Sequence, residues 1–151
     1  MRQFATPPYP SLRLRPLDAA CKDCIAETQF PATLQFSRVE NIAGLDQRLT
    51  RARGQTVMLD FYADWCVSCK EMERYTFSDA AVRARLRPVL LLQVDMTANN
   101  DADKALLKRY SLYGFPAILF FDAQGKELGD FRVTGYQDAA QFLKTLQAAG
   151  L

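Results

Sequence analysis

Four cysteines, arranged as two Cys-x-x-Cys pairs, are the residues of this sequence best suited to chemistry. The pairs are Cys21/Cys24 and Cys66/Cys69. Two thiols at this spacing can close a disulfide and can exchange it with another protein through a mixed disulfide. The 151-residue chain contains no histidine, which excludes Ser-His-Asp triads, Cys-His proteases and histidine-bound metals. We therefore expect catalysis by thiols, carboxylates or the backbone, without a metal or another cofactor.

The surroundings of Cys66 favour a redox role. This residue follows a mostly apolar segment, residues 57–63, that is typical of a buried strand, and it begins a helical stretch that extends to about Thr76. Unpaired N–H groups and the helix dipole stabilise an anion at a helix N-terminus, so Cys66 is the expected nucleophile. Cys69 lies one turn deeper and is expected to resolve the mixed disulfide. A structural disulfide or two packed thiols is the alternative.

The pair Cys21/Cys24 lies in a proline-rich segment with no strand in front of it. Passive thiols are the leading interpretation, and a second redox pair that exchanges with Cys66/Cys69 is the alternative. A four-cysteine zinc site would need both pairs. The 41 residues between Cys24 and Cys66 greatly exceed the usual spacing of zinc ribbons and fingers, which argues against that site.

Two carboxylates are candidates for proton transfer during the thiol chemistry. Asp60 interrupts the apolar segment six residues before Cys66, and a buried carboxyl group is costly unless it has a function. Glu73 lies four residues after Cys69, on the same face of the expected helix. Together they could accept and return protons while the dithiol forms and breaks. For Glu73 the alternative is an ordinary solvated charge on a helix.

The distribution of proline and glycine marks a boundary near residue 32. Five of the seven prolines lie within residues 1–31, whereas all seven glycines lie at Gly44 or later. We therefore expect residues 1–31 to be an extended N-terminal linker and residues 32–151 to form one domain. Strand-like and helical segments alternate in this domain, which predicts an α/β fold with a mixed sheet of four or five strands. The expected strands lie near residues 33–38, 57–63, 89–96, 117–122 and 131–134.

Charge and hydropathy exclude several classes of partner. Nineteen Lys and Arg residues nearly balance 17 Asp and Glu residues, so neither nucleic acid nor a membrane surface is an expected partner. The longest apolar runs have about five residues, far fewer than the ~20 needed to cross a bilayer. The first residues also lack the apolar stretch of a secretory signal peptide. We expect a soluble monomer that is either cytosolic or a piece of a larger protein.

The sequence around the second cysteine pair resembles that of the thioredoxin superfamily. Residues 57–70 read VMLDFYADWCVSCK, and the longer stretch through residue 79 is similar to the C-terminal periplasmic domain of the DsbD family of bacterial thiol:disulfide interchange proteins. Further similar segments are residues 93–99, 114–122 and 132–136. The resemblance covers roughly residues 33–149 and therefore leaves out Cys21/Cys24.

This resemblance implies a thioredoxin fold and an electron relay. A domain of this family takes two electrons from a membrane-embedded domain and passes them to an N-terminal periplasmic domain of the same protein. The resemblance therefore also implies a periplasmic location. By resemblance, Pro116 is a cis-proline opposite the cysteine pair, and the backbone of Phe115 pairs with an incoming partner strand. Trp65 is expected to pack beside the site and to contact the partner. A free-standing thioredoxin-like reductase is the alternative.

Overall fold

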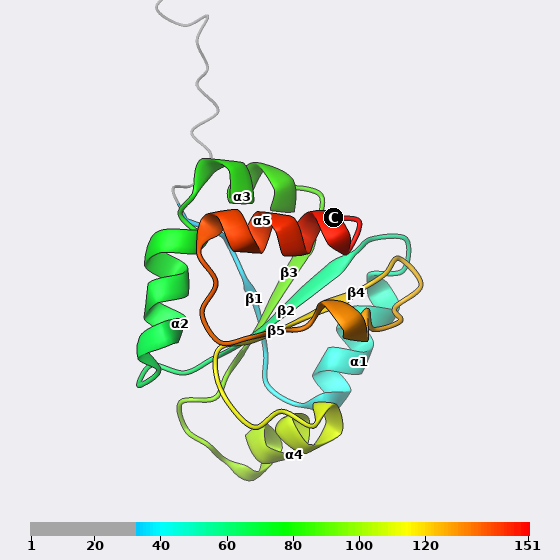
Figure 1. The fold of residues 1–151 in the computed structure, drawn as a ribbon. Helices are drawn as coiled ribbons and strands as arrows, with labels where there is room; N and C mark the ends of the chain where they lie inside the picture. Colours follow the sequence, from blue (N-terminus) through cyan, green and yellow to red (C-terminus); the bar gives the residue numbers. More distant parts are fainter. Residues whose placement is uncertain (1–32) are drawn as a thin grey trace, which may run out of the picture. The chain divides into compact units, whose positions relative to one another are not determined.

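The computed structural model describes residues 33–151, which form a five-stranded sheet with helices on both faces (Figure 1). The strands are β1 (Ser37–Val39), β2 (Val57–Tyr62), β3 (Leu90–Asp95), β4 (Ala117–Phe121) and β5 (Val133–Thr134). The α-helices are α1 (Ile42–Arg51), α2 (Val67–Glu71), α3 (Ala80–Leu86), α4 (Asp101–Tyr110) and α5 (Ala139–Ala148). A π-helical turn, η1 (Met72–Thr76), follows α2, and a 3-10 turn, η2 (Gly129–Phe131), precedes β5.

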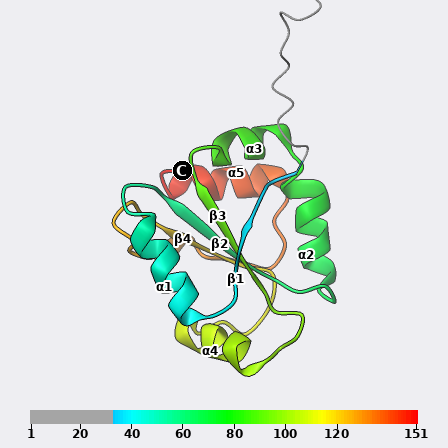
Figure 2. The same cartoon turned by 180° about the vertical axis from the view of Figure 1, so that it is seen from behind.

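The strand order is β1-β3-β2-β4-β5, with β2 at the centre. The strands β1, β3 and β2 are parallel, whereas β4 is antiparallel to β2 and β5 is antiparallel to β4. Figure 2 shows β1 at one edge of this sheet. The predicted α/β class and the mixed sheet are therefore confirmed.

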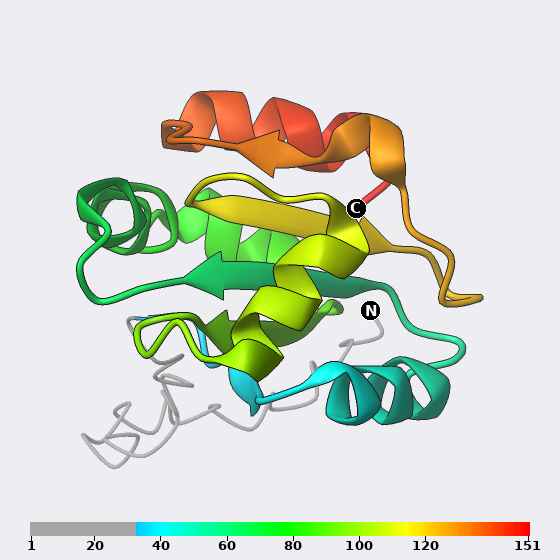
Figure 3. The same ribbon diagram turned by 90° about the horizontal axis from the view of Figure 1, so that it is seen from below.

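Two hydrophobic clusters fill the space on the two faces of the sheet. Side chains of β2 alternate between them, with Leu59 and Phe61 in the cluster beneath α1 and α4 and Met58 in the cluster beneath α3 and α5. Figure 3 shows α4 crossing the strands on one face. Because β2 is covered on both faces, every one of its six residues is buried. This rigid central strand leads directly to the cysteine pair.

Local sequence signals define where the helices begin. The Asp79 carboxylate accepts hydrogen bonds from the first N–H groups of α3, and Asp138 does the same for α5. Asn100 and Asp103 form a reciprocal capping box at the start of α4.

Within residues 33–151 no helix is long and apolar enough to cross a membrane.

Three predicted elements differ from the structure in their extent. The expected strand at 131–134 is shorter, because Gly129–Phe131 forms the turn η2 and only Val133 and Thr134 pair with β4. The expected strand at 33–38 is hydrogen-bonded only over β1, because β1 pairs with β3 from Ser37 onward, while Leu34 and Phe36 still pack against the α3/α5 cluster. The expected single helix up to Thr76 is divided into α2 and η1. The wider π turn places an additional residue in that part of the helix and changes the direction of the side chains that follow.

Candidate dithiol–disulfide site

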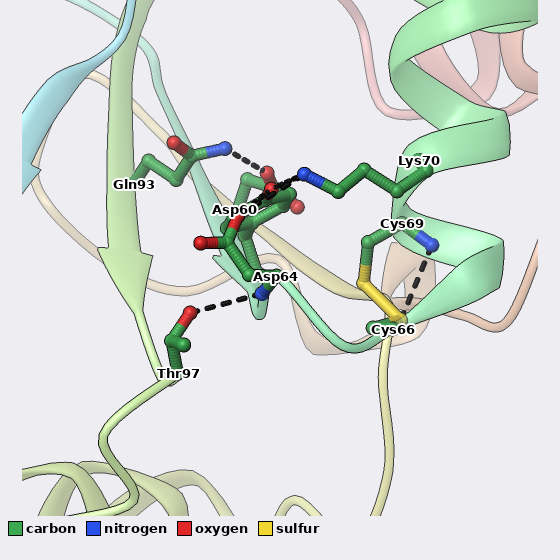
Figure 4. The surroundings of a disulfide bond; sticks show 8 residues. Asp60, Asp64, Cys66, Cys69, Lys70, Gln93 and Thr97 are labelled. Atoms are coloured by element: carbon green, nitrogen blue, oxygen red, sulfur yellow. Dashed lines mark hydrogen bonds and ion pairs between the residues drawn. A yellow bond between two sulfur atoms is a disulfide. The ribbon is translucent and has the colours of Figure 1, made fainter.

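Cys66 and Cys69 form a disulfide at the point where the chain leaves β2 and enters α2 (Figure 4). Cys66 is the N-cap residue of α2, and its Sγ accepts a hydrogen bond of 3.2 Å from the backbone N–H of Cys69. The Cα atoms are 5.3 Å apart. Both residues are buried, Cys69 more deeply than Cys66, at 3% and 8% exposure. The structure thus places both cysteines where the sequence predicted them.

Asp60 lies within β2 and is buried among apolar side chains, with an exposure of only 3%. The Nε2 atom of Gln93 donates a hydrogen bond of 2.7 Å to its Oδ2 (Figure 4). Burial raises the pKa of Asp60 to about 7, and the negative charge of Glu73 acts in the same direction. The Gln93 hydrogen bond and the Arg38 charge oppose this rise in pKa. Asp60 therefore changes its charge near neutral pH.

Glu73 lies at the beginning of η1 and is exposed. It borders a hollow of about 330 Å³ between η1 and the start of the domain, and Arg38 and Gln93 line the same hollow. The remaining lining residues are Thr33, Leu34, Phe36 and Phe77. Glu73 is thus exposed, and its charge nevertheless acts on the pKa of Asp60.

The sequence analysis missed a polar network that joins Lys70 of α2 to Tyr62 at the end of β2 and to Asp64 between the two elements. Lys70 donates a hydrogen bond to the hydroxyl of Tyr62. It donates another, of 3.1 Å, to Asp64 Oδ1 (Figure 4). The Tyr62 hydroxyl also donates to the same carboxylate oxygen at 2.5 Å. These bonds raise the pKa of Lys70 and lower the pKa of Asp64, so both groups stay charged near neutral pH. The available sequence signal was the position of Lys70, four residues after Cys66.

Thr97, which follows β3, holds the turn that precedes Cys66. Its Oγ1 accepts a hydrogen bond of 2.9 Å from the backbone N–H of Asp64 (Figure 4). Its carbonyl accepts a bond of 3.3 Å from the indole Nε1 of Trp65. The turn between β2 and the disulfide is therefore fixed to the neighbouring strand.

The three residues expected to contact a partner lie together. The ring of Trp65, which is 59% exposed, meets the ring of Phe115 edge to face, with centroids 5.6 Å apart. The Phe115–Pro116 peptide bond is cis, as predicted. The Pro116 carbonyl accepts a bond of 2.9 Å from the N–H of Gly135, which follows the edge strand β5.

Further exposed apolar residues lie close in sequence to these three. Tyr113, at 97% exposure, borders a second hollow of about 270 Å³ that Phe115 and Gly135 also line. Val67, next to Cys66, is 73% exposed. Sequence reasoning overlooked both residues, and the signal that could have revealed them is an apolar side chain outside any amphipathic pattern.

The pair Cys21/Cys24 lies outside the described residues, and so does the whole of the proposed 1–31 linker. Among residues 33–151 no three or more His, Cys, Asp or Glu side chains are grouped as metal ligands. The zinc alternative requires Cys21 and Cys24, so it is left to experiment.

Comparisons with known proteins agree with this geometry. The thioredoxin-like domain family matches residues 44–150. The thiol:disulfide interchange protein DsbD of Salmonella paratyphi A is 55% identical over 114 residues, which cover 76% of this chain and 20% of that protein. The chain thus spans about a fifth of the length of the curated relatives it matches.

Solved structures show the same relationship at the level of one domain. The oxidised C-terminal domain of Neisseria meningitidis DsbD is 34% identical, with a TM-score of 0.59 over 71% of this chain and 90% of that one. For the reduced form the identity is 30% and the TM-score 0.60, over 74% of this chain and 99% of that one. A Cys-x-x-Cys disulfide at the start of a helix in this fold is a thiol–disulfide exchange site. The chain belongs to the thioredoxin-like family and, within it, to the C-terminal domains of the thiol:disulfide interchange protein DsbD.

Proposed function

We propose that this domain carries two electrons between protein partners, with Cys66 as the nucleophile and Cys69 as the resolving thiol. The observation that carries this assignment is the hydrogen bond from the Cys69 N–H to Cys66 Sγ at the N-cap of α2. A helix N-terminus stabilises negative charge on the first sulfur and offers nothing comparable to the second. The greater burial of Cys69 also favours attack by Cys66 on an external disulfide.

The exchange reduces one partner disulfide and oxidises the domain. The Cys66 thiolate attacks a partner sulfur, the partner disulfide breaks, and one partner sulfur leaves as a thiolate. Cys69 then loses its proton and attacks Cys66 Sγ, which closes the Cys66–Cys69 disulfide and releases the second partner sulfur. Two electrons pass to the partner, and the same steps in reverse reload the domain from a donor dithiol.

Asp60 is the proposed acceptor of the Cys69 proton. A base that works near neutral pH needs a pKa near 7, and burial gives Asp60 that value. Glu73 assists by raising the pKa of Asp60 through its charge. Water carries the proton between the sulfur and the carboxylate in this proposal.

The partner is proposed to bind over Trp65, Phe115 and Pro116. The exposed indole and the phenyl ring beside it form an apolar contact area close to the disulfide, and Tyr113 enlarges it. Aromatic residues are the usual anchors of protein interfaces. The Pro116 carbonyl is already bonded to the N–H of Gly135, so the backbone of Phe115 is the group proposed to pair with an extended partner segment.

The relatives support a place for this domain in a larger reductase. They are named thiol:disulfide interchange proteins, and this chain matches about a fifth of their length. We infer a membrane-embedded donor domain, an N-terminal periplasmic acceptor domain, and a periplasmic location for the present domain. In this proposal the domain is monomeric and residues 1–31 are the linker that joins it to the rest.

The assignment of the two cysteines is tested by trapping. Cys69→Ala should leave Cys66 in stable mixed disulfides with protein partners, which non-reducing gels and mass spectrometry would identify. Cys66→Ala is the matched control and should trap none. Capture by Cys66→Ala alone would reverse the roles, and capture by neither variant would reject the exchange mechanism.

A further inference from the structure

Three polar side chains stand in one row across the sheet. Arg38 of β1 is aligned with Gln93 of β3, and Gln93 is aligned with Asp60 of β2. Residues in register on neighbouring strands present their side chains on the same face. The row therefore runs from the exposed edge strand to the buried carboxylate, with Gln93 in the middle.

Gln93 is the member of this row that connects Asp60 with the hollow. It is only 4% exposed, yet it lines the hollow of about 330 Å³ whose border includes Arg38 and Glu73. Its amide nitrogen lies 2.7 Å from Asp60 Oδ2. The amide group thus lies between the buried carboxylate and the open space beside η1.

We propose that Gln93 is a positioning residue for the proton transfer at Asp60: its amide binds Oδ2 and thereby leaves Oδ1 as the oxygen that takes up and releases the proton. This inference rests on the proposed role of Asp60 in the exchange reaction. Gln93 itself neither gains nor loses a proton.

The chemistry of a neutral amide explains why glutamine suits this position. Its N–H stabilises the ionised carboxylate without adding a charge, so Asp60 can exist in both protonation states near neutral pH. A lysine here would hold Asp60 ionised, and an apolar residue would keep it protonated. The charged groups that act on Asp60 from the neighbouring elements are Arg38 on β1 and Glu73 on η1, and their opposite charges offset each other in part.

The hollow also makes this position testable by substitution. It provides room beside Gln93 for a longer side chain, so a lysine can extend there without displacing the core. Arg38 directs its guanidinium group toward Asp95, at 3.4 Å, and remains available as a fixed charge in every variant.

The experiment is a carboxyl carbon NMR titration of Asp60 in the oxidised protein, with Gln93→Leu, Gln93→Met and Gln93→Lys. Loss of the donor in the Leu and Met variants should raise the midpoint by about 1 pH unit, and Lys should lower it by about 1 unit. The pH midpoint of the rate of disulfide reduction should move in the same directions. Gln55→Leu, which removes an amide that donates to the Pro88 carbonyl instead, should change neither midpoint.

A higher midpoint in the Leu and Met variants together with a lower midpoint in the Lys variant cannot arise from a merely structural role of Gln93. Loss of packing would shift the midpoint in the same direction in all three variants. Midpoints that stay within about 0.3 unit of the wild type in the Lys variant and in either apolar variant would overturn the inference. Trapping of partners by Cys69→Ala does not involve Gln93. Successful trapping together with unchanged midpoints would therefore reject the role of Gln93 and leave the proposed function standing. Failure of trapping would reject the proposed function itself.

Discussion

The ammonium group of Lys70 lies 3.1 Å from the carboxylate of Asp64 and also donates to the hydroxyl of Tyr62. Lys70 is four residues after Cys66, the spacing at which a helical cation could stabilise a thiolate. Because Asp64 offsets its charge, Lys70 contributes little stabilisation to an anion at the sulfur. The stabilisation of a Cys66 thiolate by the helix N-terminus is then opposed by the negative charges of Asp60 and Glu73.

This balance predicts that Cys66 is not a strongly acidic thiol. The helix terminus contributes about 0.3 to 2 kcal/mol in favour of the thiolate, whereas two nearby carboxylates and burial act against it. We expect a Cys66 pKa at or above about 8.5, measured as the pH dependence of the alkylation rate of the reduced protein. Asp60→Asn combined with Glu73→Gln should lower the pKa of Cys66. A wild-type pKa below about 7, or no decrease in the double variant, would show that the carboxylates do not control this thiol.

Asp60 should make the stability of the oxidised domain decrease as the pH rises. Its pKa is about 7 in the folded protein against 3.8 in the unfolded chain, so the stability it contributes is complete below pH 3.8 and is lost as the pH rises through 7. The difference corresponds to a loss on the order of 4 kcal/mol. Asp60→Asn should therefore be increasingly more stable than the wild type between pH 4 and 8 in urea unfolding.

The exposed carboxylate of Glu40 provides the control for this measurement. Glu40→Gln should show a stability difference from the wild type that changes little with pH, because Glu40 is exposed and lies outside the helices. If the stability difference between Asp60→Asn and the wild type changed equally little with pH, burial would not be raising the pKa of Asp60.

Trp65 and Phe115 should matter for protein partners and not for small thiols. Trp65→Ala and Phe115→Ala each remove one ring of the edge-to-face pair, and we expect exchange with a protein disulfide to slow about tenfold or more. Reduction by dithiothreitol should change by less than about twofold, since a small reagent needs no docking surface. Tyr75→Ala is the control, because that tyrosine is similarly exposed and its ring contacts Arg74. Equal slowing with both reductants would reject a docking role.

Thr76 should stabilise the junction between η1 and the segment before α5. Its fully buried hydroxyl donates a hydrogen bond of 2.6 Å to the Gln137 carbonyl. Thr76→Val leaves that carbonyl without this donor and should reduce the free energy of unfolding by about 1 to 3 kcal/mol. Thr76→Ser keeps the hydroxyl and should lose less. Thr50→Val, at an exposed helix position, is the control and should have little effect; a similar loss there would contradict the argument.

The pair Cys21/Cys24 should be dispensable for exchange at Cys66. Cys21→Ala with Cys24→Ala should retain the rate of insulin disulfide reduction to within about twofold, since passive thiols contribute nothing to the attacking sulfur. Metal analysis of the purified wild type tests the zinc alternative in parallel. Stoichiometric zinc that is lost on mutating either pair would contradict the exchange function.

The sequence was sufficient for the fold and for the two reactive cysteines, because both depend on local signals. Apolar runs identified the buried strands, and the position of Cys66 between a strand and a helix located the disulfide. Asp60 was identifiable because a carboxylate in an apolar strand violates the pattern of its surroundings. These features can all be read within a few consecutive residues.

The contacts that the sequence could not supply join residues far apart in the chain. Gln93 pairs with Asp60 across 33 positions, and an isolated glutamine in a strand carries no signal of its partner. Thr97 and Trp65 are 32 positions apart. The π turn at Met72–Thr76 was also missed, since its residues fit an ordinary α-helical pattern. Strand register and side-chain packing determine these details.

The disulfide joins residues only three positions apart at the start of one helix. Opening so short a loop restores little conformational entropy to the unfolded chain, so the bond contributes little to holding the fold together. The two hydrophobic clusters that stabilise the domain are built from side chains of the whole sheet and its helices, so opening this one bond should leave them assembled. The domain can therefore pass through repeated redox cycles without unfolding, because the sulfurs change their oxidation state while the packed core stays the same.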